Sequence, residues 1–106
     1  MKLLEIFFTE LLGTFIFLSV IIVTGSPLFI GLTLAFVIYL GKSISGGHYN
    51  PAVTFLFWMQ GDLGNLRTSI ELIAQYLGAM GAYLLYNNMS KQLIKDIRSC
   101  YLISIL

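Results

Sequence analysis

Charged residues are scarce in this sequence. Lys, Arg, Asp and Glu make up 10% of its 106 residues, whereas about a quarter of the residues in soluble domains are charged. Residues 11–41 contain none of them. Because 58% of the chain is hydrophobic, this scarcity argues against a soluble domain and predicts an integral, multi-pass membrane protein in contact with the lipid bilayer. The basic residues form no stripe, so we expect no nucleic-acid partner.

Residues that carry catalysis or bind metals are equally scarce. The single His48 and the single Cys100 lie far apart in the chain, so neither a metal site nor an internal disulfide is expected. No nucleophile–base pair and no phosphate-binding loop stands out. We therefore expect that the protein is not an enzyme and that it uses no cofactor and no metal.

Proline occurs only twice, and each proline marks a boundary. As one helix, residues 11–41 would reach roughly 46 Å, too long for a comfortable membrane span. Gly25-Ser26-Pro27 interrupts this run and predicts a tight hairpin between a first span at about residues 3–24 and a second at about 28–42. A third span is expected at about residues 66–88.

The second proline starts a short apolar helix. Asn50 is a good N-cap residue and Pro51 suits the first helical position, so a helix is predicted from Pro51 to Gln60, with Gly61 at its C-terminal end. Its ten residues reach roughly 15 Å, about half the hydrocarbon thickness of a bilayer. Such a helix predicts a re-entrant segment, which a membrane tolerates where it is buried in protein or lines a wet cavity. The segment 43–60 therefore indicates a pore.

Three motifs, in this order, resemble the aquaporin (major intrinsic protein) family. The first helix of that family is similar to Thr9-Glu10-Leu11-Leu12-Gly13-Thr14-Phe15. Its first Asn-Pro-Ala loop is similar to Ser45-Gly46-Gly47-His48-Tyr49-Asn50-Pro51-Ala52-Val53-Thr54, and its third helix to Leu72-Ile73-Ala74-Gln75-Tyr76-Leu77-Gly78-Ala79.

The resemblance implies one half of the aquaporin fold: an all-α membrane protein with three transmembrane helices and a re-entrant Asn-Pro-Ala half-helix. We assign this half-channel to residues 1–88. The tail, residues 89–106, shows no resemblance, although its charged first part could form an interfacial helix. Two inverted halves complete the pore in the family, and these 106 residues contain one Asn-Pro-Ala tripeptide.

The resemblance also suggests roles for individual residues. Asn50, with Pro51 and Ala52, would stand at the pore centre and donate a hydrogen bond to permeating water. The carbonyl groups of Gly46, Gly47 and His48 would line one vestibule. The alternative for Asn50 is a simple N-cap. The alternative for the segment from Gly46 to His48 is a flexible loop.

Polar residues inside the spans receive structural roles. An ionisable group inside a span is costly and is usually paired or functional. For Glu10 the resemblance implies a carboxylate that braces the re-entrant loop by accepting hydrogen bonds from its backbone, with snorkelling to the interface as the alternative. Gln75 is interpreted as a second brace, and Glu71 as an interfacial charge. By alignment alone, Ile30 falls at the selectivity-filter position of the second helix.

The small residues of the spans, Gly31 with Ala35 and Ala74 with Gly78 and Ala82, are spaced for close helix packing. We expect this packing within the chain, with a dimer seam as the alternative.

We interpret the chain as part of a passive transmembrane channel for water or small neutral solutes, completed by a second half or by an opposed copy. Assembly as a homo-oligomer or with another aquaporin-like chain is therefore expected. The alternatives are a non-conducting relative that binds and modulates full-length channels, and a degenerate product.

Overall fold

The computed structural model describes residues 2–105, with side chains to residue 101. In this range the chain forms five α-helices and no strand, which confirms the all-α prediction. The helices are α1 (Lys2–Thr24), α2 (Pro27–Ser45), α3 (Pro51–Met59), α4 (Asn65–Asn88) and α5 (Lys91–Ile105).

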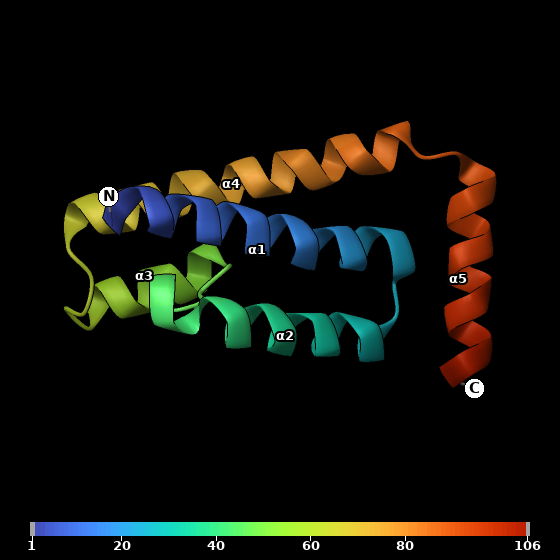
Figure 1. Cartoon of the computed structure of the whole chain (residues 1–106), viewed down its shortest axis with the longest axis horizontal. Helices are drawn as coiled ribbons and strands as arrows, with labels where there is room; N and C mark the ends of the chain where they lie inside the picture. The colour runs from blue at the N-terminus through green and yellow to red at the C-terminus, as the bar shows by residue number, and fades with distance from the viewer. Residues whose placement is uncertain (1, 106) are drawn as a thin grey trace.

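The helices form a bundle centred on α1, which packs against both α2 and α4 (Figure 1). These three helices run along the long axis of the molecule, which measures 44 × 27 × 22 Å. The short α3 starts part-way along the bundle and runs beside α4 to one end, whereas α5 crosses the opposite end almost at right angles (Figure 1).

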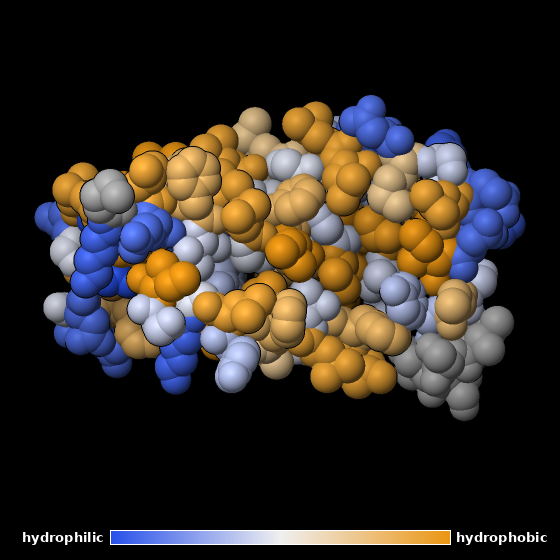
Figure 2. Space-filling model, in the orientation of Figure 1, coloured by the Kyte–Doolittle hydropathy of each residue, from blue (hydrophilic) through white to orange (hydrophobic). Residues whose placement is uncertain are grey.

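The surface of the bundle suits a lipid surrounding. α1 and α2 are each long and apolar enough to cross a membrane. α4 has a comparable length of 24 residues, but its first half is more polar because it carries Arg67, Glu71 and Gln75. Figure 2 shows a mainly hydrophobic middle with hydrophilic residues gathered at both ends. The exposed side chains of the middle include Leu32, Phe36, Met80 and Tyr83.

The hairpin between α1 and α2 follows the predicted turn chemistry. Gly25 has a φ of +61°, a conformation that glycine adopts without strain. The Ser26 side chain accepts a hydrogen bond from the backbone N–H of Phe29 at 3.4 Å, and Pro27 is the first residue of α2. The N-cap and the proline together end one helix and start the next within two residues.

Small residues let α4 approach α1 closely. Ala74, Gly78 and Ala82 are all buried, and a Cβ added to Gly78 would lie 2.7 Å from the carbonyl oxygen of Leu11. This stripe therefore packs within the chain, as predicted. The same prediction is wrong for α2, because Gly31 and Ala35 are exposed.

At the far end, an arginine links α5 to α1. Arg98 donates hydrogen bonds to the carbonyl oxygens of Ile22 and Val23, at 2.8 and 3.1 Å. These carbonyls belong to the last turn of α1, where no intrahelical partner is available. The ring centroid of Tyr101 also lies 4.2 Å from that of Phe29.

Candidate pore loop and its buried polar network

The loop that joins α2 to α3 has an unusual backbone. Gly46 and Gly47 have φ values of +91° and +64°, and Tyr49 has a φ of +53°. A bulky residue in this left-handed region is rare and is kept there by its surroundings. The loop therefore depends on contacts that hold Tyr49 and the residues beside it.

Tyr49 is wedged between α1 and α2. Its hydroxyl group donates a hydrogen bond to the carbonyl oxygen of Val37 at 2.7 Å. The ring occupies space left free by two glycines, since a Cβ on Gly13 or on Gly41 would overlap it. Gly13 and Gly41 thus form the slot that holds the loop.

Glu10 also holds this loop in place. This residue of α1 is 0% exposed. Its carboxylate accepts four hydrogen bonds: from the backbone N–H groups of Tyr49 (2.7 Å) and His48 (3.1 Å), the hydroxyl of Ser45 (2.5 Å) and the amide nitrogen of Gln75 (2.9 Å). Such donors compensate for much of the cost of burying the charge.

Glu71 forms a second buried carboxylate, also 0% exposed. Its oxygens accept hydrogen bonds from His48 Nδ1 (2.6 Å), Thr54 Oγ1 (3.1 Å) and Arg67 Nε (2.9 Å). The expectation that Glu71 is an interfacial charge is therefore wrong. Arg67 also donates to the backbone oxygen of Ser45 at 2.8 Å, so it binds the last carbonyl of α2.

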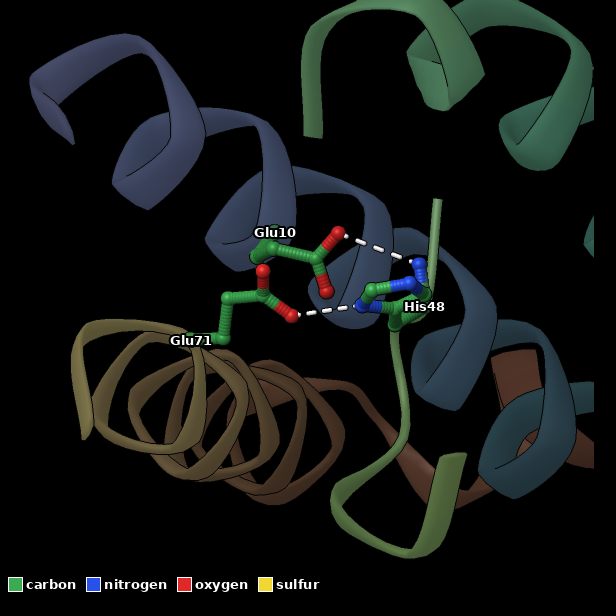
Figure 3. A group of neighbouring side chains, drawn as sticks. All are labelled: Glu10, His48 and Glu71. Carbon is green, nitrogen blue, oxygen red and sulfur yellow. Dashed lines mark hydrogen bonds and ion pairs between the residues drawn. The ribbon is translucent and has the colours of Figure 1, made fainter. Parts of the chain in front are cut away.

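The two carboxylates belong to one network. His48 bonds Glu10 through its backbone N–H and Glu71 through its ring (Figure 3). Gln75 donates to Glu10 and, at 2.7 Å, to Thr54, whose hydroxyl in turn contacts Glu71. Because carboxylate oxygens only accept, Nδ1 of His48 carries the hydrogen of its bond to Glu71. The network joins α1, α3 and α4 to the loop.

Three residues of this network, Glu10, His48 and Glu71, are of types that bind metals. One ligand atom each from Glu10, His48 and Glu71 lies within 4.8 Å of the others. However, every carboxylate oxygen of the pair already accepts a hydrogen bond, and the cationic Arg67 occupies one of them. A metal ion would have to displace these donors, so the arrangement fits a hydrogen-bonded brace and not a metal centre.

Asn50 stands where the loop enters α3. Its side-chain oxygen accepts a hydrogen bond from the backbone N–H of Ala52 at 2.9 Å, and Pro51 begins the helix. The Asn50 residue is exposed. Because the oxygen is engaged by the cap, the amide nitrogen is the group that can donate outward.

The family model of the major intrinsic proteins matches residues 19–104. The chain belongs to the major intrinsic protein family. It is therefore an integral, multi-pass membrane protein of a family of water and solute channels, which are transporters and not enzymes. The match includes most of α5, a segment in which the sequence motifs gave no resemblance.

Several curated relatives align with this chain of the major intrinsic protein family. The propanediol uptake facilitator PduF of Salmonella typhimurium is 36% identical over 98 residues, covering 76% of the chain and 37% of the relative. Aquaporin Z of Photorhabdus laumondii is 37% identical over 93 residues, covering 73% and 40%. The glycerol uptake facilitator of Buchnera aphidicola is 41% identical over 63 residues, covering 56% and 24%. No solved structure gives a significant match.

The chain thus spans less than half the length of these relatives. Within it, the structure brings His48, Glu10 and Gln75 together at the loop, with Asn50 two residues further along. Ile30 lies apart from them, in the first turn of α2, roughly 22 Å along the helix from Ser45. The pore roles of Asn50, Gly46, Gly47 and Ile30 stay predictions.

Sequence reasoning missed Glu71, Arg67, Thr54 and Tyr49 as parts of this site. A signal for the first two was present, since Arg67, Glu71 and Gln75 recur every four residues and so share one helix face. The left-handed backbone of Tyr49 and its glycine slot leave no comparable sequence pattern.

Proposed function

We propose that this chain supplies one half of a passive transmembrane channel for water or small neutral solutes. A second half, or an opposed copy of the chain, completes the pore. Asn50 donates a hydrogen bond to the permeating molecule, while Glu10 and Gln75 keep the loop in place. The carbonyl groups of Gly46, Gly47 and His48 line the approach to Asn50.

The observation that carries this proposal is the position of Asn50 at the start of a half-length helix. α3 has nine residues, roughly 14 Å, and starts part-way along the bundle (Figure 1). Its N-terminus carries a partial positive charge that disfavours cations and protons. The names of the relatives, which are facilitators of glycerol and propanediol uptake and aquaporins, support the same class of neutral cargo.

Osmotic shrinkage of proteoliposomes, followed by stopped-flow light scattering, tests the proposal. Vesicles that contain only this chain should shrink faster than empty vesicles, and Asn50→Asp should remove the gain by placing a negative charge at the helix N-terminus. Asn87→Asp makes the same chemical change at an exposed position of α4 and should leave the rate unchanged.

Shrinkage at the rate of empty vesicles, with folded protein present, would contradict conduction by this chain alone. That result would favour a second candidate function, in which the chain binds full-length channels and modulates them. The outward face of α2 favours it, because nothing lies within 4 Å of a Cβ added to Gly31, which leaves room for a partner helix. Co-purification with a tagged aquaporin, weakened by Gly31→Leu, would distinguish this function.

A further inference from the structure

A small cavity lies beside the start of α3, between α1 and α4. Its volume is about 250 Å³. Its lining includes the polar side chains of Thr14, Asn50 and Gln75, two tyrosines, and apolar residues such as Phe17, Leu18 and Ala79. The cavity is thus next to the polar network but outside the hydrogen bonds described above.

Two polar atoms at this cavity lack a partner within the described chain. Thr14 Oγ1 and Gln75 Oε1 are buried and make no hydrogen bond, and the two residues are only 2% and 1% exposed. A buried acceptor without a partner costs about 1–3 kcal/mol. Two such atoms at one cavity call for a ligand that satisfies both.

The orientation of the Gln75 amide follows from its neighbours. Its nitrogen donates to the carboxylate of Glu10 at 2.9 Å, and a carboxylate cannot donate in return. A flipped amide would place two acceptors against each other, so the oxygen must face away from Glu10. The unpartnered Oε1 is therefore a fixed acceptor.

We propose that a resident water molecule occupies this cavity and bridges Thr14 to Gln75. The water donates one hydrogen bond to Gln75 Oε1 and accepts one from the hydroxyl of Thr14. The cavity is large enough, because a water molecule takes about 30 Å³ in the liquid.

The bound water extends the polar network toward the Asn-Pro-Ala loop. It connects α1, through Thr14, to the face of α4 that already holds Glu10. The site does not depend on whether the chain conducts, because it concerns a water that stays in place and not one that permeates.

The sign of the stability change in Thr14→Val tests the proposal. Valine keeps the shape of threonine but removes the hydroxyl, so the water and its bond to Gln75 are lost. The melting temperature (Tm) of the full chain in lipid nanodiscs should fall by about 4 °C. Without a bridging water, valine would only replace an unpartnered buried hydroxyl, and the Tm would stay or rise.

Ser19→Ala is the matched control. Ser19 Oγ is likewise buried without a partner, but Ser19 does not line this cavity. Its removal should leave the Tm unchanged or raise it. A fall as large as that of Thr14→Val would show a general effect of losing hydroxyls from α1 and would overturn the assignment.

A structure at a resolution that shows water decides the site directly. In buffer free of glycerol and other polyols, a density peak should lie about 3 Å from both Thr14 Oγ1 and Gln75 Oε1, and it should be absent in Thr14→Val. A peak seen only when a polyol is added would assign the cavity to a solute hydroxyl group. Either that result or an empty cavity in the unaltered protein overturns the proposal.

Discussion

The two ends of the bundle are held together in different ways. At the loop end, two buried carboxylates accept hydrogen bonds from three helices and from the loop itself. At the other end, the exposed Arg98 of α5 donates hydrogen bonds to two carbonyl oxygens of α1, and Ile94 of α5 is buried. The first end fixes a loop with a left-handed, irregular backbone, whereas the second docks a complete helix.

This difference has a physical consequence. A hydrogen bond to a charged group contributes about 1.5–3 kcal/mol, and a buried partner left behind loses the full cost of its desolvation. At the α5 end, the donor Arg98 is exposed and its two acceptors are neutral carbonyl groups, so a lost bond leaves no buried charge behind. Mutations at the loop end should therefore be severe, and those at the α5 end mild.

Replacing Glu10 should have the largest effect. In Glu10→Gln the side chain keeps its size but loses its charge and one acceptor, and its new NH₂ group faces donors from the loop. Each hydrogen bond to the charged carboxylate contributes about 1.5–3 kcal/mol, so the loss of more than one of them is severe. We expect a large loss of Tm in detergent and little folded protein in the membrane.

Glu5→Gln provides the control for Glu10, since it makes the same change in the same helix at an exposed position. It should leave the Tm within about 1 °C of the unaltered chain. Equal stability of Glu10→Gln and Glu5→Gln would show that the brace is dispensable and would remove the contrast between the two ends.

Closing the slot for Tyr49 should have the next largest effect. A Cβ in Gly13→Ala would overlap the Tyr49 ring, and overpacking of this kind costs about 1–3 kcal/mol. Gly31→Ala adds the same methyl group to α2 where nothing lies within 4 Å, so it should be neutral or stabilising by up to about 1 kcal/mol. Chemical denaturation measures the free energy of unfolding of both variants. Equal values would contradict the role of Gly13 in the slot for Tyr49.

Much of this arrangement was readable from the sequence. The Ser26-Pro27 and Asn50-Pro51 pairs carry their own capping chemistry, so helix starts at residues 27 and 51 follow from local interactions. The cost of a carboxylate inside an apolar span marked Glu10 as paired or functional, and the family resemblance suggested the loop as its partner. The two capping signals can be read from the sequence because each depends on residues that are neighbours in the chain.

The remaining features depend on contacts between distant segments. Glu71 lies less than two turns from the start of α4, and its burial depends on contacts with His48 and Thr54 from other segments. The exposure of Gly31 and Ala35 depends on which face of α2 meets α1, and the small residues alone do not fix that face. The orientation of α5 could not be predicted either, because it depends on where the carbonyl oxygens of Ile22 and Val23 lie.

The smallest effect is expected at Arg98. In Arg98→Ala the carbonyl oxygens of Ile22 and Val23 lose their donor. Because the donor is an exposed side chain and the acceptors are neutral, the loss is about 1 kcal/mol. Hydrogen exchange of the α5 amides should accelerate, while the amides of α1 around Glu10 keep their protection. Lys95→Ala, an exposed change in the same helix, should not affect exchange to the same degree. If Arg98→Ala also exposed the α1 amides, α5 would belong to the same cooperative unit as the loop end, and the two ends of the bundle would not be independent.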